Sequence, residues 1–515
     1  MNLAALDLSS TRDLLIAFAP ELVLTAWTIV VLLTVAWRHR TARDLRVAGW
    51  MTLAGLASAA GAAWFLWWQR AAAPGIPAMI AVDDFRFVAD WLFLGTAAVT
   101  VLVSFDYLER ENLLAPEYYV LLLFGTLGMM LMAGGADLMM IFLGLEVMSV
   151  SVYVLTGINR RSVASAEAAL KYFLLGAFGS GFLVYGIALV YGATGTTNLP
   201  SIGSQIALAS LQSSVLLLAG LAFVLVGFGF KVAAVPFHMW APDVYDGAPT
   251  PVTAYMATGV KAAAFAALFR VLAEGFGAVA AWPQIVWWLA VATMVVGNLA
   301  ALAQRTVKRM LAYSSVAHAG YLLVAVATGS AAGSAALLFY LVAYTLMTLA
   351  AFALLAAKGR NGERDVLIDD LAGLASGRPW LAFALAVCML SLLGFPATAG
   401  FIGKWYILVA AIAAGQTALA AVLVLTSVVS AGYYLPVIMA MYMKPEPFEQ
   451  AHAPMRLGLL GRAAVFASVV GLLYFGVQPN RLLDLARASG ATVRKAPLPA
   501  AMSPAPPAPR APTGN

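Results

Sequence analysis

The stretch GFGFKVAAVPFHMW, residues 227–240, places a lysine and a histidine inside an apolar run and separates them by a proline. A charge at the centre of a lipid bilayer costs about 2.5–3.5 kcal/mol on insertion scales, so Lys231 must face protein or water. Pro236 removes a backbone donor, and Gly227 and Gly229 loosen the turn before it. A broken helix at membrane depth is tolerated only where protein or water satisfies the freed backbone groups. The stretch therefore predicts a hydrated, buried cavity beside Lys231.

The composition of the whole chain indicates that this stretch lies in a lipid bilayer. Of the 515 residues, 63% are hydrophobic and only 10% are charged, whereas soluble domains carry roughly 25% charged residues. The net charge of +6 is scattered over short loops, which excludes a nucleic-acid-binding protein. The single cysteine, Cys388, excludes a disulfide framework. The sequence shows no metal-ligand cluster and no phosphate-binding or dinucleotide motif.

Apolar runs of about 20 residues recur along the chain, and each is long enough to cross a bilayer. They predict an all-α, polytopic membrane protein of about 14 transmembrane helices. The predicted spans are 14–37, 48–69, 86–106, 117–134, 136–157, 166–191, 211–240, 250–273, 282–303, 308–328, 333–357, 380–410, 415–443 and 458–477. The first run is long enough for a retained span and lacks the pattern of a cleavable signal.

The positive charges predict the orientation of the chain. Most lysines and arginines lie in loops that follow odd-numbered spans. The N-terminal segment and the other loops, counted together with the span ends next to them, hold only Arg12, Arg70, Arg86 and Arg270. Because positive loops stay in the cytoplasm, both termini are predicted on the non-cytoplasmic side of a bacterial inner (plasma) membrane.

Four lysines, Lys171, Lys231, Lys261 and Lys404, fall within the predicted spans, and no arginine is assigned to one. An arginine stays protonated at any accessible pH, whereas a buried lysine can release its proton. Glu146 lies at a depth close to that of Lys171 on the next, antiparallel span, so we expect these two to pair. A static ion pair is the alternative for them. Lys171 and Lys404 also lie near enough to a membrane surface for their ammonium groups to extend to it.

A second break follows the pattern of the first. The stretch GFPATAGFIGKWYIL (394–408) has Gly394 and Pro396 just before Lys404. The broken seventh and twelfth spans are five apart, and five is odd, so spans 4–8 and 9–13 are predicted to be inverted five-helix repeats, as in transporters. The predicted divisions are a three-span N-terminal segment (1–116), the two repeats (117–273 and 282–443), a last span (444–480) and a Pro/Ala-rich tail (481–515) disordered at its end.

Two histidines are candidate proton relays. His238 follows Lys231 within two turns, and His318 lies in the tenth span, where it would link the two halves. Histidine changes its charge near physiological pH, which suits a relay. The alternative is that His318 is a buried histidine that is simply hydrogen-bonded.

Three stretches carry a family resemblance. PFHMWAPDVYDGAPTPVTAYMATGVKAAAFA (236–266) resembles the signature region of the antiporter-like subunits of proton-pumping NADH:quinone oxidoreductase, respiratory complex I. EAALKYFLLGAFGSGFLVYGIALVYGATGTTNL (167–199) and the second broken stretch resemble its N subunit in particular. A lysine at position 404 favours the N type over the M type, and the lack of a long C-terminal lateral helix argues against the L type. The resemblance covers roughly residues 15–480, and the tail departs from it.

The resemblance implies a role for each site residue. Glu146 and Lys171 would be the acidic and modulating members of a pair, Lys231 and Lys261 the central relay lysines, and Lys404 the lysine that faces the exit route. His238 and His318 match histidines on the polar axis of the family. The chain would be a translocase subunit without a cofactor or redox centre of its own. NADH, flavin, iron–sulfur clusters and quinone would bind in partner subunits of the complex.

Two other functions are compatible with the residues. A subunit of a cation/proton antiporter would look similar, but sodium needs oxygen-rich coordination, and these spans offer lysines and few acids. A passive scaffold that docks neighbouring pump subunits is the second, and its interior lysines should tolerate neutral replacement. No polar partners for a quinone head group stand out.

Overall fold

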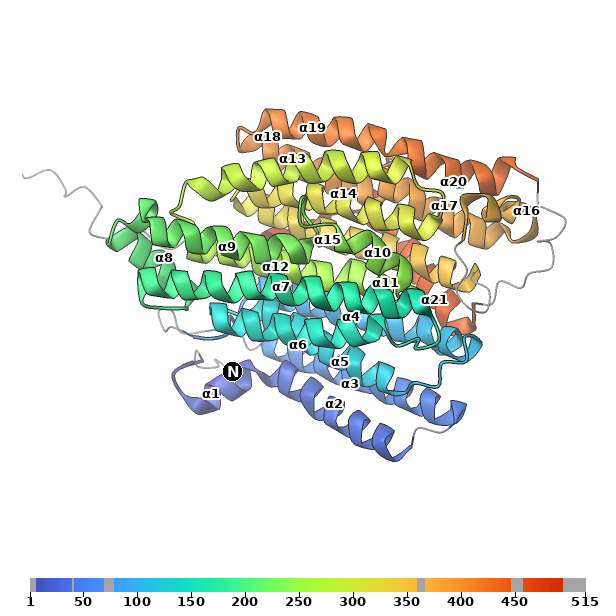
Figure 1. The fold of residues 1–515 in the computed structure, drawn as a ribbon, viewed down its shortest axis with the longest axis horizontal. Coiled ribbons are helices and arrows are strands. Elements are labelled where there is room, and N and C mark those ends of the chain that lie inside the picture. The colour runs from blue at the N-terminus through green and yellow to red at the C-terminus, as the bar shows by residue number, and fades with distance from the viewer. Residues whose placement is uncertain (1–5, 39–40, 69–77, 359–365, 446–456, 494–515) are drawn as a thin grey trace, which may run out of the picture.

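The computed structural model describes residues 6–38, 41–68, 78–358, 366–445 and 457–493. Within these ranges the chain is almost entirely helical, and its only β structure is three isolated bridges. The long helices lie side by side in one bundle, with α2 (Ala19–Trp37) at one edge and α19 (Thr417–Val429) at the other (Figure 1). The loop with Arg70 and the end of the predicted tail lie outside the described residues.

The long helices follow the predicted spans closely. In the first half, after α2, they are α3 (Ala42–Trp68), α4 (Asp84–Arg110), α5 (Glu117–Gly134), α6 (Leu138–Thr156), α7 (Val163–Thr194) and α9 (Val215–Val232). The next span is continuous from Thr250 to Gly275 and consists of α11 (Thr250–Tyr255), the π-helical η2 (Met256–Val260), α12 (Lys261–Arg270) and the π-helical η3 (Val271–Gly275). The remaining ones are α13 (Ala281–Leu302), α14 (Val307–Ala327), α15 (Ala331–Lys358), α17 (Pro379–Leu393), α18 (Ala399–Ala413), α20 (Ala431–Met443) and α21 (Leu459–Val477).

Thirteen of the described helical segments are long and apolar enough to cross a membrane. The two shorter apolar helices α17 and α18 form one further span across a break. The prediction of an all-α, polytopic membrane protein of about 14 spans is therefore confirmed.

Several short helices connect the spans or end the chain. They are α1 (Thr11–Ala17), α8 (Leu199–Leu208), η1 (Leu211–Ser213), α10 (Trp240–Gly247), η4 (Ile368–Leu371), α16 (Leu374–Gly377) and α22 (Asn480–Thr492). The last of these packs against α15 and α4. The first part of the predicted tail is therefore an ordered helix, because its apolar side chains Leu483 and Ala486 are buried against the bundle.

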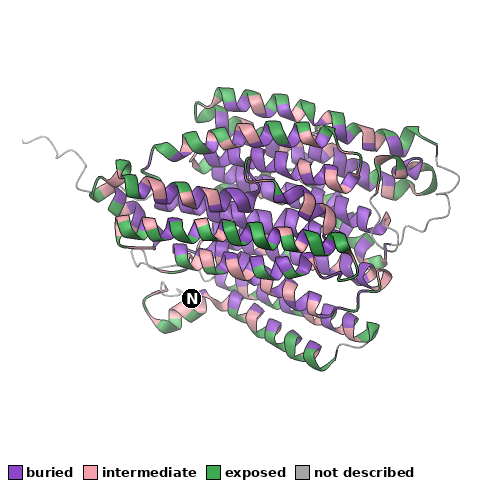
Figure 2. Ribbon diagram, viewed as in Figure 1, coloured by how far each residue is buried: buried purple, intermediate pink, exposed green. Residues whose placement is uncertain are grey.

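Burial separates the helices inside the bundle from those on its surface (Figure 2). In the Thr250–Gly275 span and in α14, 94% of an 18-residue apolar stretch is buried inside the chain. The corresponding share in α2 and α7 is 33%. The exposed faces of α2 and α7 carry large apolar side chains such as Leu33 and Phe178. Such faces suit contact with lipid or with apolar protein surfaces. Side chains on the middle helices are instead screened from lipid.

Glycines bring two helix pairs into close contact. A Cβ atom at Gly128 of α5 would collide with the backbone of α6 at Met148, and one at Gly297 of α13 would collide with the backbone of α14 at Ala317. Small residues at such crossings let apolar helices approach closely. The helices α5 and α6 are the first two spans of the first predicted five-helix repeat, and α13 and α14 are the first two of the second. The same close packing therefore occurs at equivalent places in both repeats. The repeat boundaries themselves stay a prediction.

The first break separates α9 from α10, next to Pro236. The freed backbone groups find side-chain partners on neighbouring segments. The Val235 amide donates to Thr293 Oγ1 of α13 at 2.9 Å, and the Trp240 indole donates to the Phe230 carbonyl at 2.9 Å. Protein side chains thus meet the requirement for satisfied backbone groups at membrane depth.

The second break separates α17 from α18, at Gly394 and Pro396. Gly394 ends α17 in the left-handed region, with φ of +89°, a conformation that glycine adopts without steric cost. Here the freed carbonyls of Leu392 and Leu393 accept hydrogen bonds from the Lys404 ammonium, at 3.0 and 2.9 Å. The two helix breaks predicted from sequence are present, and different groups satisfy the freed backbone at each of them.

Candidate functional site

Four of the predicted site residues lie deep in the bundle. Lys231 at the end of α9, Lys261 at the start of α12, His318 on α14 and Lys404 on α18 are between 1% and 6% exposed. We refer to these four side chains as the buried row. Unpaired charges in such a place are costly, so their partners determine what the row can do.

Glu146 on α6 faces Lys231. Its carboxylate accepts a hydrogen bond from the Ser180 hydroxyl of α7, and Ser180 and Lys231 line the same narrow cavity. The charge of Glu146 also acts on Lys231. The cavity has no volume for a water-sized sphere. The predicted hydrated cavity beside Lys231 is therefore wrong for this conformation, because Leu145, Leu183 and Phe230 close the space around it.

Aromatic rings surround the Lys231 ammonium. Its Nζ lies 5.3 Å from the ring centroids of Tyr153 and Tyr172. Tyr172 stacks on Trp240 with centroids 4.4 Å apart, and Trp240 contacts the edge of Tyr245. Aromatic faces attract a cation without giving it a hydrogen-bond acceptor. Lys231 is thus held by rings, and a chain of rings leads from it toward the middle of the bundle.

Lys261 is held by hydroxyl and carbonyl oxygens. Its Nζ donates to the Ser315 carbonyl at 2.5 Å and also to the Ser315 hydroxyl on α14. That hydroxyl accepts a second hydrogen bond, from Tyr344 of α15 at 2.9 Å. The lysine follows directly after the π-helical turn η2, and such turns often occur at functional sites.

His318 lies between two tyrosine hydroxyls. Its Nδ1 is 2.6 Å from the Tyr340 oxygen and its Nε2 is 3.0 Å from the Tyr434 oxygen, and Tyr434 also bonds Ser314. In neutral imidazole one ring nitrogen donates and the other accepts, so the ring can pass a proton from one tyrosine side to the other. The charges of Lys261 and Lys404 both act on this ring.

One aromatic ring, that of Tyr321, lies between Lys404 and His318 and contacts both. The Lys404 Nζ lies 4.7 Å from the centroid of Tyr321, whose ring contacts His318 with centroids 5.3 Å apart. Besides the two carbonyls of the second break, Nζ donates to Ser427 Oγ at 2.7 Å. A Cβ atom at Gly394 would lie 3.1 Å from Lys404 Cδ, so the glycine leaves room for the lysine stem.

Lys171 is not part of the buried row. Its ammonium pairs with Glu167 at 2.7 Å and with Asp243 at 2.9 Å, and Arg309 donates to the other Asp243 oxygen at 2.8 Å. These groups line a polar cavity of about 220 Å³, which we refer to as the vestibule. Burial acts to raise the pKa of Asp243, but the hydrogen bonds from Lys171 and Arg309 outweigh it and lower that pKa below its ordinary value.

The predicted pair of Glu146 with Lys171 is therefore wrong. The α7 residue that faces Glu146 is Ser180, nine residues beyond Lys171 and thus about 14 Å further along the helix at 1.5 Å per residue. Depth alone suggested the pair, but the packing of α7 turns Lys171 toward α10, where Asp243 offers a carboxylate.

His238 lies half-buried in the first break, beside Pro236. Within the described part of the chain, no hydrogen bond joins its side chain to any of the four lysines. Its relay role stays a prediction.

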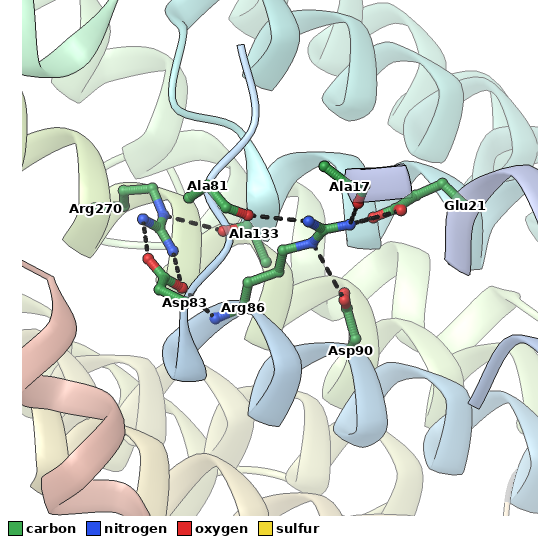
Figure 3. A network of polar contacts seen from close by, with 8 residues as sticks. All are labelled: Ala17, Glu21, Ala81, Asp83, Arg86, Asp90, Ala133 and Arg270. Atoms are coloured by element: carbon green, nitrogen blue, oxygen red, sulfur yellow. Dashed lines mark hydrogen bonds and ion pairs between the residues drawn. The ribbon is translucent and has the colours of Figure 1, made fainter. Parts of the chain in front are cut away.

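The prediction that no arginine lies in a span is wrong. Arg86 of α4 and Arg270 of α12 are fully buried within their helices. Their guanidinium groups are paired with the carboxylates of Glu21 and Asp83 (Figure 3) and, for Arg270, also with that of Glu274. Counting charges along the sequence assigned these arginines to loops, because Glu21 and Asp83, which pair with Arg86 and Arg270, lie 65 and 187 residues away in the chain.

Sequence reasoning also missed the polar partners of the buried row. The side chains that hold Lys261, His318 and Lys404 are Ser315, Tyr340, Tyr434 and Ser427. Serines and tyrosines recur throughout the apolar helices, so no local signal singles these out. Asp243, in contrast, carries a charge just after the first break, and that signal could have marked it.

A family model described as "NADH:quinone oxidoreductase/Mrp antiporter, TM" matches residues 135–430. The matched region contains both breaks and the whole buried row. A chain of the Mrp complex from Dietzia sp. DQ12-45-1b has the same fold, with a TM-score of 0.80, 24% identity and coverage of 93% of this chain and 97% of that one. Fold and site together define a polytopic, antiporter-like membrane subunit.

More similar proteins narrow this class. The NADH-quinone oxidoreductase subunit N of Gemmatimonas aurantiaca is 46% identical over 511 residues, which cover 96% of this chain and 97% of that protein. Subunit N of Trichlorobacter lovleyi is 48% identical over 85% of this chain and 89% of its own. A chain in a structure of respiratory complex I from Thermus thermophilus with bound aureothin is 39% identical, with a TM-score of 0.77 and coverage of 91% and 100%. The chain belongs to the NADH-quinone oxidoreductase subunit N family.

Proposed function

We propose that the buried row is the path along which this chain moves protons. As a member of the subunit N family, the chain is a proton-translocating membrane subunit of NADH-quinone oxidoreductase and works beside other membrane subunits of complex I. NADH, flavin, iron–sulfur clusters and quinone belong, in this proposal, to partner subunits. The membrane is the bacterial inner membrane, with both termini on the non-cytoplasmic side.

The observation that carries this proposal is the unbroken set of contacts between Lys261 and Lys404. Ser315 and Tyr344 contact Lys261, the Tyr344 ring contacts His318, and Tyr321 contacts both His318 and Lys404. Hydroxyls and a histidine can each accept and donate a proton. The exchangeable groups therefore lie next to one another across the middle of the bundle, and where only ring contacts join them a proton passes when side chains move or water enters.

The proposed uptake side is the vestibule around Lys171 and Asp243, because this polar cavity is lined by Asp243 of α10, the helix that follows the first break. From there protons reach Glu146 and Lys231, then Lys261, His318 and Lys404. Moving one charge against 100 mV takes about 2.3 kcal/mol, and one pKa unit corresponds to about 1.4 kcal/mol. Changes of a few pKa units, driven by charge changes during quinone reduction, are therefore sufficient.

The test replaces Lys231 by methionine in the assembled complex. Because Lys231 is held by aromatic rings, methionine keeps its packing and leaves no hydrogen-bond acceptor unpaired. We expect Lys231→Met to assemble fully and to lose pumping-coupled quinone reductase activity, measured in vesicles with a pH-sensitive dye. Lys444→Met is the matched control, since Lys444 is exposed and pairs with Asp369 on the surface.

Full coupled activity in Lys231→Met would remove Lys231 from the path. If Lys261→Met and Lys404→Met also pumped normally, the chain would be a scaffold subunit. Cation exchange by the purified chain alone would instead support the antiporter alternative, which the family model also includes.

A further inference from the structure

A second group of buried charges lies away from the buried row, where side chains of α2, α4 and α12 meet (Figure 3), and Glu274 of η3 joins it. We refer to it as the arginine cluster. It contains two guanidinium groups and four carboxyl groups, namely Arg86, Arg270, Glu21, Asp83, Asp90 and Glu274. If all six were ionised, the cluster would carry two negative charges in excess. None of the six residues takes part in the proposed proton path.

Each of the two arginines already forms an ion pair, Arg86 with Glu21 and Arg270 with Asp83. Arg86 Nη2 donates to both oxygens of Glu21 at 2.7 Å and to the Ala17 carbonyl at 2.9 Å. Its Nη1 donates to the Ala81 carbonyl at 3.0 Å. Arg270 holds both oxygens of Asp83, at 2.8 and 2.9 Å. The Arg270–Asp83 pair is two-pronged, which is the strong kind, whereas Arg86 Nη2 shares its two N–H groups among three oxygens. Of the Arg86 nitrogens, only Nε makes no hydrogen bond.

Two acids remain, and their surroundings differ. Glu274 accepts a hydrogen bond from Arg270 at 2.9 Å and its side chain is 11% exposed. Asp90 is fully buried, and neither of its oxygens has a hydrogen-bond partner. The nearest cationic atom is Arg86 Nε at 3.5 Å, which itself makes no hydrogen bond. An ionised carboxylate in such a place lacks both solvent and donors.

The charged groups that act on Asp90 come from α2, from the start of α4 and from α12. They are Glu21 of α2, Asp83 and Arg86 at the start of α4, and Arg270 of α12. Two of these are acids and two are arginines already neutralised by acids. The surroundings therefore provide no net positive charge to balance a negative Asp90.

We propose that Asp90 is a proton-binding site separate from the buried row, and that it holds a proton at neutral pH as a neutral carboxylic acid. Glu21 and Asp90 then compete for Arg86. While Glu21 is the counterion of the guanidinium, Asp90 keeps its proton. When Glu21 takes up the proton of Asp90, the Asp90 O–H bond breaks, an O–H bond forms on Glu21, and the Arg86 guanidinium becomes the counterion of the Asp90 carboxylate. This inference does not depend on the proposed proton path.

The experiment is infrared spectroscopy of the assembled complex at neutral pH, in H₂O and in D₂O. A protonated carboxylic acid has a C=O stretching band that is separate from carboxylate bands and shifts in D₂O. Asp90→Asn should remove one such band and should melt at the same temperature as the wild type, since asparagine replaces one neutral side chain by another. Asp106→Asn, a partly exposed acid on the same helix that accepts from the Gly458 amide, is the matched control and should leave the band unchanged.

Glu21→Gln provides the second arm. It leaves Asp90 in place but takes away the counterion of Arg86, so the Asp90 band should disappear although Asp90 is present. An unchanged spectrum for Asp90→Asn would show that Asp90 is ionised and would overturn the proposal. A band that persists in Glu21→Gln would overturn the competition for Arg86. Strong destabilisation by Asp90→Asn would contradict a neutral Asp90 as well.

Discussion

Each lysine of the buried row is held in a different way. Lys231 is surrounded by aromatic rings, Lys261 bonds a serine carbonyl and hydroxyl, and Lys404 bonds two helix-end carbonyls and a serine hydroxyl. An ammonium group that donates to several acceptors satisfies polar groups of the protein and also carries a charge. An ammonium group that faces rings contributes its charge but satisfies no acceptor. The same residue type therefore contributes differently to stability at the three positions.

The stability of methionine variants should follow this difference. Lys404→Met leaves the carbonyl of Leu392 without a partner and that of Leu393 with only the longer hydrogen bond from Ser427 at 3.3 Å, whereas Lys231→Met leaves no acceptor unpaired. An unsatisfied buried acceptor costs about 1–3 kcal/mol. We therefore expect Lys404→Met to be less stable than Lys231→Met by at least that amount, measured as thermal unfolding of the assembled complex. Equal stability of the two variants would show that the carbonyls find other partners.

Among the helices, the two broken spans hold the site together. At the first break a threonine of α13 and a tryptophan of α10 satisfy the backbone, and at the second break Lys404 of α18 does so. The breaks leave polar backbone in the interior, and neighbouring elements must supply its partners. The position of α13 beside the first break therefore supplies an acceptor that the break requires.

Thr293→Val tests this role of α13. Valine has nearly the same shape, but it leaves the Val235 amide without an acceptor. We expect a loss of about 1–3 kcal/mol in stability, the cost of an unsatisfied buried donor. Thr52→Val is the matched control, because the Thr52 hydroxyl only bonds the Ala48 carbonyl four residues before it in the same helix. If both variants lose the same stability, Thr293 has no special role at the break.

The whole bundle is held at one end by the arginine cluster. Asp83 caps the start of α4 by accepting from the Arg86 amide at 2.8 Å and also binds Arg270 of α12, so it joins segments 187 residues apart. Burial acts to raise the pKa of Asp83, but the charge and hydrogen bonds of Arg270 outweigh it and keep that pKa below its ordinary value. The far end of the bundle holds the vestibule, where Asp243 similarly joins α7 and α14 through Lys171 and Arg309.

Arg270→Met should destabilise the whole chain. It leaves Asp83 and Glu274 without their arginine, and breaking a buried pair costs about 3–5 kcal/mol. Arg487→Met is the control, since its side chain is 61% exposed. Because the folded pKa of Asp83 is lowered, its stabilisation is complete at neutral pH and is lost as the pH falls through that lowered value. The difference between wild type and Arg270→Met, measured by thermal melting, should therefore narrow below about pH 4. A constant difference at all pH values would mean that Asp83 does not provide it.

Hydropathy and residue type alone were enough to predict the number of spans, the buried lysines and both helix breaks. These properties are local: a run of about 20 apolar residues, a proline in a helix or a lysine in an apolar run has the same consequence wherever the helix packs. Lys231, Lys261 and Lys404 were found in this way because an unscreened charge in lipid is costly at any depth.

The partners of those residues were decided only by the tertiary structure. Which side chain faces Glu146 depends on how α7 is rotated about its axis, and this placed Ser180 there and turned Lys171 to Asp243. The arginine cluster depends on the meeting of helices far apart in sequence, so counting charges along the chain misassigned Arg86 and Arg270. The sequence determines which groups cannot face lipid, because that depends only on residue type and the local apolar run. Helix packing determines which groups they contact instead, because contacts between distant helices leave no local sequence pattern.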